Sequence, residues 1–288
     1  MARLGDFVAL ARPRHWIKNV FVLMPLPHSL ASGGVLDVGA YTIGVAGFCL
    51  ACSAVYAFND SRDAARDRRH PKKRDRPVAA GRVTPGVAVL FGLLLLSAGL
   101  LLSWASGHPA ALALTLAYVA INLLYSLWAR AVPLLDVFLL ASGFVLRVLL
   151  GCALVHVVAS GWLLLCTSTL ALFMALAKRR SDLLTGIDDF HRGSLGGYDL
   201  GFLEQAISVM AAMALMSYAI YCMEAKVLRE GREFASLPFV VFGVLEYLRR
   251  VQEPDAGGSP VDLALHSRAL QLCGVGWVLA TLWSLGWP

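Results

Sequence analysis

The sequence predicts an all-α integral membrane protein with nine transmembrane helices around a polar cavity that faces the cytoplasm. Its 288 residues are 58% hydrophobic and only 15% charged, a composition that a soluble domain of this length does not have. Apolar runs of near membrane-spanning length recur from end to end. The net charge of +6 sits in loops beside these runs, which is ordinary membrane topology and gives no reason to expect a nucleic-acid partner. We expect residues 1–288 to form a single polytopic membrane domain.

The first predicted span covers about residues 16–32 and should kink or break at Pro25 and Pro27. Lys18 and Asn19 lie in its first turn, where polar groups are costly unless they face a polar cavity. For Lys18 alone, a side chain that snorkels to the membrane surface is an equally good interpretation.

The other eight spans follow from the remaining apolar runs. They cover approximately residues 40–58, 87–106, 110–128, 134–157, 161–177, 200–223, 234–247 and 269–287. A tight turn at Gly107-His108-Pro109 joins the third span to the fourth. Arg147 lies well inside the fifth span, so it either pairs with a group on another helix or meets a phosphate. The six cysteines have neither zinc-site nor disulfide spacing, and we interpret them as small core residues.

The distribution of basic residues predicts the orientation. Of the 25 lysines and arginines, 21 fall at the N-terminus and in the loops after spans two, four, six and eight, three fall in the linker after span seven, and Arg147 is intramembrane. This bias predicts a plasma (inner) membrane protein with its N-terminus in the cytoplasm and its C-terminus outside. Two long polar loops, residues 59–85 and 178–199, then both face the cytoplasm and can close over one cavity.

One polar stretch, residues 59–82, indicates the chemistry. Asp60, Asp63 and Asp67 are spaced by three and four residues, so they share a face if the preceding helix continues through them. Three unpaired acids would repel one another, whereas Mg²⁺ takes carboxylate oxygens together with the oxygens of a substrate phosphate. Arginines and lysines follow directly, and this combination is typical of a phosphate or diphosphate site. A positive-inside loop would account for the basic residues but not for three aspartates in register.

The same stretch resembles a known family. Asn59-Asp60-x-x-Asp63-x-x-x-Asp67, followed by Arg76-Pro77-Val78-Ala79-Ala80-Gly81, resembles the first aspartate-rich motif of the UbiA-type intramembrane prenyltransferases. The resemblance extends over the whole chain in topology. It implies nine transmembrane helices around a cytoplasm-facing cavity, with Mg²⁺ bridging the aspartates to a diphosphate.

Other segments are similar to one branch, the decaprenyl-phosphate phosphoribosyltransferases. They are Arg12-Pro13-Arg14-x-Trp16-x-Lys18-Asn19, SGFVLR around Arg147, Ala177-Lys178-Arg179-Arg180-Ser181-Asp182 and Pro238-Phe239-Val240-Val241. This similarity implies transfer of 5-phosphoribose from phosphoribosyl diphosphate (PRPP) to a polyprenyl phosphate such as decaprenyl phosphate, with release of diphosphate. The product of that branch is a lipid-linked pentose donor for cell-wall synthesis.

The charges of these residues, together with the resemblance, suggest roles for them. Asp60, Asp63 and Asp67 are the expected catalytic and Mg²⁺-binding residues, and the substrate-binding candidates come from both loops and from the polar ends of spans. The substrate-binding candidates are Lys18, Asn19, Asn59, Arg66, Lys73, Arg74, Arg76, Tyr125, Arg147, Lys178, Arg179, Asp182, Arg192 and Tyr198. Within this set, Lys178, Arg179 and Arg192 are expected to bind the 5-phosphate or the lipid phosphate, with Tyr198 nearby.

Two alternatives stay open. A prenyltransferase that joins a polyprenyl diphosphate to an aromatic or isoprenoid acceptor would usually carry a second Asp-x-x-x-Asp, whereas the second loop here has a single Asp182 after a basic run. A lipid transporter should show paired repeats with broken helices, and the sequence has no internal repeat. A homo-oligomer is neither favoured nor excluded.

Overall fold

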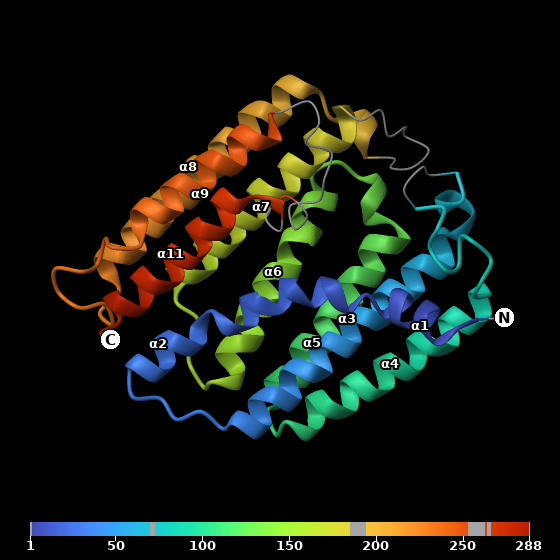
Figure 1. Cartoon of the computed structure of the whole chain (residues 1–288), viewed down its shortest axis with the longest axis horizontal. Helices are drawn as coiled ribbons and strands as arrows, with labels where there is room; N and C mark the ends of the chain where they lie inside the picture. The colour runs from blue at the N-terminus through green and yellow to red at the C-terminus, as the bar shows by residue number, and fades with distance from the viewer. Residues whose placement is uncertain (1, 70–72, 185–193, 253–262, 264–265, 288) are drawn as a thin grey trace. The chain divides into compact units, whose positions relative to one another are not determined.

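The computed structural model describes residues 2–69, 73–184, 194–252, 263 and 266–287, and this part of the chain contains helices but no strands (Figure 1). The all-α prediction is therefore confirmed for these residues. The chain divides into two compact units. Unit 1 comprises Met1–Leu23, Leu36–Leu127 and Leu149–Val157, and unit 2 comprises Met24–Val35, Trp128–Val148 and Val158–Pro288.

Unit 1 is built around one long helix, α3, which contacts each of the other principal helices of the unit (Figure 1). These elements are α1 (Leu4–Ala11), the 3-10 helix η1 (Pro13–Leu23), α3 (Val38–Asp67), α4 (Pro85–Ala105) and α5 (Pro109–Leu127). The backbones of α3 and α4 approach closely, because a methyl group added at Gly47 would lie 2.7 Å from the carbonyl oxygen of Gly99. Small residues at such crossings are typical of helices that pack in membranes.

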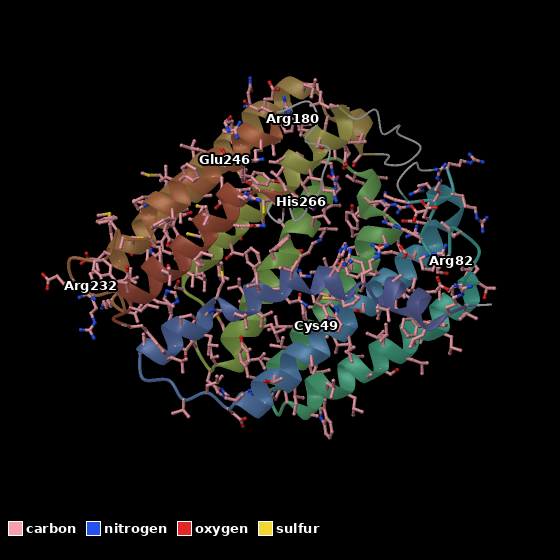
Figure 2. All side chains as sticks on the ribbon, viewed as in Figure 1. Cys49, Arg82, Arg180, Arg232, Glu246 and His266 are labelled. Atoms are coloured by element: carbon pink, nitrogen blue, oxygen red, sulfur yellow. The ribbon has the colours of Figure 1, made fainter. Side chains whose placement is uncertain are left out.

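The first predicted span is broken, as its prolines predicted. η1 ends at Leu23 and the next helix, α2, begins at Pro25 and ends at Ala31. Polar contacts hold η1 against α3: the Trp16 indole donates to Ser53 Oγ at 2.9 Å, and the Asn19 amide donates at 3.0 Å to Sγ of Cys49, which is labelled in Figure 2.

Unit 2 contains α2 and the later helices of the chain. These are α6 (Leu135–Leu154, which crosses into unit 1 after Val148), α7 (Gly161–Leu184), α8 (Leu200–Glu224), α9 (Leu237–Val251) and α11 (Arg268–Ser284), with two short 3-10 turns, η2 (Ala129–Ala131) and η3 (Leu195–Gly197). α7 packs along α8, and α9 contacts α7, α8 and α11 (Figure 1). Phe173, Leu203 and Tyr247 belong to the buried core that these helices enclose.

Six helices in the described part of the chain are long and apolar enough to cross a membrane: α3, α4, α5, α6, α7 and α8. α9 has 15 residues and α11 has 17, which leaves both a little short of a full span. The count of nine spans therefore stays a prediction. α3 and α7 run on to Asp67 and Leu184, past the ends predicted at residues 58 and 177. The first residues of both predicted polar loops, 59–67 and 178–184, are therefore helical.

Candidate functional site

The three aspartates of the first motif lie on the last turns of α3. Because α3 continues to Asp67, the condition for a shared face is met. Asp60 and Asp67 are buried, with 2% and 4% of their surface exposed, and Asp63 is partly buried. Asp63 forms an ion pair with Arg66 one turn later at 3.8 Å.

Two arginines from outside α3 occupy this face. Asp60 Oδ1 accepts hydrogen bonds from Arg12 and, at 3.1 Å, from Nη1 of Arg76. The same Arg76 nitrogen donates to Asp67 Oδ2 at 2.7 Å, so Arg76 bridges two carboxylates. The sequence predicted Arg76 as a substrate ligand. Arg12 was absent from the predicted site residues, although it begins the Arg12-Pro13-Arg14 segment.

Arg12 reaches Asp60 from an unusual backbone conformation. It caps α1 with a left-handed φ of 52°, a region that is costly for a non-glycine residue. The conformation turns the chain from α1 into η1 and places the guanidinium 5.1 Å from the centre of the Tyr56 ring, next to Asp60. Fully buried Leu10 anchors α1, and so fixes where Arg12 stands.

The segment after Arg76 forms a compact turn that explains the Arg-Pro-Val-Ala-Ala-Gly pattern. Val78 packs into the same buried cluster as Leu10, and Gly81 adopts a left-handed φ of 75°. The backbone N–H of Ala80 donates to the carbonyl oxygen of Arg76 at 2.8 Å, which closes the turn. Its apolar residues and its glycine therefore hold the Arg76 backbone in place.

Asn59 and Arg62 connect α3 to the end of α5. The Ser126 hydroxyl donates to Asn59 Oδ1, and Arg62 donates to the carbonyl oxygens of Ser126 and Leu127, the latter at 3.1 Å. A cation at the C-terminus of a helix satisfies its last carbonyls and complements its dipole. Tyr125 is half-buried at the same helix end, next in sequence to Ser126, which contacts Asn59.

The residues on the α3 face fit a hard divalent cation in type. Among the residues that the structure describes, the buried Asp60 Oδ2 finds no hydrogen-bond partner, whereas Oδ1 of the same carboxylate has two. Carboxylate oxygens are the ligands that Mg²⁺ prefers. No group of three His, Cys, Asp or Glu side chains within the described residues is already arranged to hold a metal. The bridging position between Asp60 and Asp67 belongs instead to the guanidinium of Arg76.

In unit 2, the residues of the second motif gather around a different carboxylate, Asp136. Arg179 is fully buried and donates from Nε to Asp136 Oδ2 at 2.6 Å and from Nη1 to Asp182 Oδ2 at 3.1 Å. A buried guanidinium requires such partners, because an isolated charge is costly in an apolar interior. The sequence predicted Arg179 and Asp182 as substrate ligands, and in this structure they pair with each other.

Asp136 also anchors the chain that leads into α8. The Ser194 hydroxyl donates to Asp136 Oδ2 at 2.9 Å and the Tyr198 hydroxyl donates to Oδ1 at 2.7 Å. The Tyr198 oxygen accepts in turn from the backbone N–H of Leu134 at 2.7 Å. Burial and then the hydrogen bond to Asp136 raise the pKa of Tyr198, so it remains a protonated donor. Sequence reasoning found Tyr198 but not Asp136, whose place after Pro133 at the start of the fifth span was the available signal.

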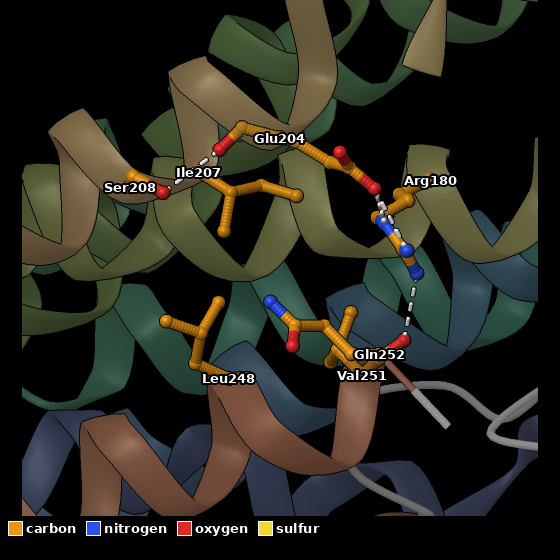
Figure 3. Close-up of a pocket in the computed structure, with 7 residues that line it drawn as sticks. All are labelled: Arg180, Glu204, Ile207, Ser208, Leu248, Val251 and Gln252. Atoms are coloured by element: carbon orange, nitrogen blue, oxygen red, sulfur yellow. Dashed lines mark hydrogen bonds and ion pairs between the residues drawn. The ribbon is translucent and has the colours of Figure 1, made fainter. Parts of the chain in front are cut away.

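Arg180 forms an ion pair with Glu204 beside a small cavity of about 320 Å³ (Figure 3). The cavity is lined by Arg180, Glu204, Ile207, Ser208, Leu248, Val251 and Gln252. Arg180 donates to Glu204 Oε1 at 2.9 Å and to the carbonyl oxygen of Val251 at 3.0 Å, so it fastens α7 to α8 and α9. The basic run therefore consists of two arginines that carboxylates neutralise and the half-buried Lys178.

The remaining predicted ligands lie in varied surroundings. Lys18 is half-buried on η1, next to Asn19, which is buried against α3. Arg147 donates to the carbonyl oxygen of Gly143 at 2.7 Å. The other two loop cations, Lys73 and Arg74, are half-buried and exposed, respectively. Arg192 lies outside the described residues.

Three comparisons bear on this arrangement. The model of the UbiA prenyltransferase family matches residues 20–225. A decaprenyl-phosphate phosphoribosyltransferase of Corynebacterium glutamicum is 33% identical over 93% of this chain and 82% of its own length, and one of Mycolicibacterium smegmatis is 32% identical over 96% and 91%. The structure of a UbiA homolog from Archaeoglobus fulgidus bound to GPP and Mg²⁺ superposes with a TM-score of 0.74 at 17% identity, covering 98% of both chains.

Proposed function

The chain belongs to the UbiA prenyltransferase family, and from this premise we propose that it transfers 5-phosphoribose from PRPP to a polyprenyl phosphate with release of diphosphate. It is a transferase and a multi-pass membrane protein. The observation that carries the finer assignment is the similarity to relatives named decaprenyl-phosphate phosphoribosyltransferase over more than nine-tenths of the chain. In this proposal decaprenyl phosphate is the acceptor and the product supplies pentose for cell-wall synthesis.

The reaction is substitution at the anomeric carbon of the ribose. The C1–oxygen bond to diphosphate breaks and a C1–oxygen bond to the lipid phosphate forms. The lipid phosphate is ionised at neutral pH and attacks without a general base, so catalysis consists of positioning and electrostatic stabilisation. Mg²⁺, held by Asp60, Asp63 and Asp67, would supply neutralisation of the negative charge that develops on the leaving diphosphate.

The cations around α3 are the proposed diphosphate ligands. Arg76 and Arg66 already stand beside the aspartates, at 2.7 Å from Asp67 and 3.8 Å from Asp63, respectively. Lys18, Asn19, Lys73 and Arg74 are proposed to extend this binding surface, together with Asn59 on α3 and Tyr125 at the end of α5. Arginine is suited to the role because its planar fork binds two phosphate oxygens at once.

The proposed ligands of the 5-phosphate or the lipid phosphate are Lys178, Arg192 and Arg147. Arg179, Asp182 and Tyr198 take a positioning role in this proposal. Their contacts with Asp136 hold the end of α7 and the chain before α8 together, and Lys178 is the residue next to Arg179. We propose the orientation that the basic residues predict, with the N-terminus in the cytoplasm, so that water-soluble PRPP reaches the site.

Purified protein with labelled PRPP, polyprenyl monophosphate and Mg²⁺ tests the assignment. We expect labelled phosphoribose on the lipid and one diphosphate released for each transfer, both measured by mass spectrometry and a diphosphate assay. Omission of Mg²⁺ with added chelator should stop the reaction. Polyprenyl diphosphate with 4-hydroxybenzoate should give no product, and prenylation of that acceptor without any ribosylated lipid would replace the assignment with aromatic prenyl transfer.

A further inference from the structure

The aspartate face of α3 is neutralised by the protein's own cations. Arg12 and Arg76 both donate to Asp60 Oδ1, and Arg76 also donates to Asp67, while the buried Asp60 Oδ2 has no partner within the described part of the chain. A divalent ion held by both Asp60 and Asp67 would occupy the position between the two carboxylates that the Arg76 guanidinium bridges. The ion and the arginines therefore compete for them.

We propose that Arg76, assisted by Arg12, is an internal counter-cation that holds Asp60 and Asp67 until metal and diphosphate arrive together. When the metal takes the carboxylates, Arg76 leaves them and binds the diphosphate oxygens. This inference rests on the proposed function for the identity of the anion, diphosphate. Its consequence is cooperative binding: the ion alone binds weakly, and diphosphate strengthens its binding.

The energetics of exchange make the two ligands interdependent. An ion that displaces Arg76 without diphosphate leaves a partly buried guanidinium without an anion, which is costly. Diphosphate supplies that anion, and a guanidinium binds it with two parallel hydrogen bonds. By linkage, diphosphate must raise the affinity for the ion by the same factor as the ion raises the affinity for diphosphate. The buried, unpartnered Asp60 Oδ2 gives the ion its first ligand before any arginine moves.

The structure allows the side chain to move while the backbone stays fixed. The compact turn after Arg76 is held by buried Val78 and by the closing hydrogen bond from Ala80. The Arg76 side chain itself is 29% exposed and that of Arg12 is 17% exposed, in contrast to 2% for Asp60 and 5% for Asp67. The arginines are therefore the exchangeable partners of this cluster.

Binding of Mn²⁺ to the purified full-length protein, followed by electron paramagnetic resonance with and without inorganic diphosphate, tests the inference. We expect wild type to bind Mn²⁺ weakly alone and at least about fivefold more tightly with diphosphate, the lower end of typical coupling. Arg76→Gln should bind Mn²⁺ alone more tightly than wild type, and diphosphate should improve its affinity less. Arg69→Gln is the matched control, because it removes the same charge from an exposed side chain of the same loop and should behave as wild type.

Arg12→Gln provides a second variant if Arg76→Gln is unstable, and it should shift Mn²⁺ affinity in the same direction by a smaller factor. Unchanged or weaker Mn²⁺ binding in both variants overturns the inference, as does equal tightening in Arg69→Gln, which would reveal only a change in net charge. Because neither PRPP nor a lipid acceptor is present, failure of the phosphoribosyl assignment leaves this result standing. Conversely, unchanged Mn²⁺ affinity in both variants, together with intact phosphoribosyl transfer by wild type, would contradict the counter-cation proposal and leave the proposed function in place.

Discussion

Two buried aspartates, Asp60 and Asp136, differ in how many of their carboxylate oxygens accept hydrogen bonds. Asp136 has both oxygens satisfied, Oδ1 by Tyr198 and Oδ2 by Arg179 and Ser194. In the described ranges of the chain, two arginines donate to Asp60 Oδ1 and no group donates to its buried Oδ2. A buried polar atom without a partner costs about 1–3 kcal/mol, so the cluster around Asp60 carries a penalty that a ligand can remove.

The arginines that pair with Asp136 and with Asp60 also differ in their exposure to solvent. The side chain of Arg179 is completely enclosed, whereas Arg12 and Arg76 retain access to solvent. Asp136 and Arg179 therefore form a closed structural pair, and Asp60 belongs to an open cluster that can exchange partners. A sequence shows both as acids near basic residues at membrane boundaries, and only the hydrogen-bond partners of each oxygen separate the two kinds of site.

The largest expected effect is on stability, from Asp136→Asn. Loss of the charge removes one of the two carboxylates that pair with the enclosed Arg179 in the described residues, and breaking a buried pair typically costs about 3–5 kcal/mol. Thermal unfolding in detergent should show a much lower midpoint, while Mn²⁺ binding in the surviving folded protein is unchanged. Asp182→Asn should cost less, because Arg179 keeps Asp136. Equal stability of Asp136→Asn and wild type would contradict the closed pair.

Asp60→Asn is expected to lower turnover more than it lowers stability. Removal of one charged ligand from the site should lower transfer by about 10²–10³-fold, as for loss of one preorganised electrostatic group. The unfolding midpoint should change less than in Asp136→Asn, since Arg12 still contacts the Tyr56 ring. Asp75→Asn, an exposed acid of the same loop, is the control and should remain active. Near-normal transfer by Asp60→Asn at ordinary Mg²⁺ would exclude its role as a ligand.

Tyr198→Phe decides whether that residue belongs to the structural pair or to the substrate site. The change leaves the backbone N–H of Leu134 and Asp136 Oδ1 without a partner, which should cost about 1–3 kcal/mol of stability. KM for PRPP and for the lipid acceptor should stay close to wild type. A raised KM with unchanged stability would return Tyr198 to the set of direct substrate ligands.

Much of the fold follows from the sequence because membrane helices have simple causes. Apolar runs predicted the six membrane-length helices to within a few residues at most ends, and Pro25 predicted the break in the first span. The ends that were missed, at Asp67 and Leu184, lie where helices continue into polar loops. Hydropathy alone marks where the membrane core ends and not where the helix ends.

The candidate site was predicted only in part. The spacing of Asp60, Asp63 and Asp67 placed them correctly on one helical face. The roles of Arg12 and Asp136 were missed, because they depend on contacts across 48 and 43 residues of sequence, to Asp60 and Arg179, respectively. Conversely, the charge of Arg179 suggested a phosphate ligand, whereas its burial between two carboxylates shows pairing. Counting charges along a loop cannot reveal which of them are already neutralised.

The smallest expected effect concerns a third acid, Asp6 of α1, which is 8% exposed and pairs with the more exposed Arg82. Its Oδ2 accepts from the backbone N–H of Arg3 at 3.0 Å and its Oδ1 accepts from Arg82 at 2.7 Å (Figure 2). The hydrogen bond from Arg3 and then that from Arg82 lower the pKa of Asp6 below its ordinary value of 3.8. A carboxyl group whose pKa is lowered by folding stabilises the fold above its unfolded pKa, and this contribution disappears as pH falls through the folded value.

Asp6→Asn should therefore lower the unfolding midpoint slightly at pH 7, and by less than any change at Asp136 or Tyr198, because the Arg82 side chain is 46% exposed and water screens its charge. The difference in unfolding midpoint between wild type and variant should stay constant down to about pH 4, near the ordinary aspartate pKa. Below that pH the difference should disappear, because the wild-type carboxyl group becomes protonated. Thermal unfolding of both proteins at pH 7, 5 and 3 measures this, with Asp75→Asn as the control that should show no such convergence. A difference that persists unchanged at pH 3 would mean that Asp6 holds α1 through packing and shape, and that its charge contributes nothing.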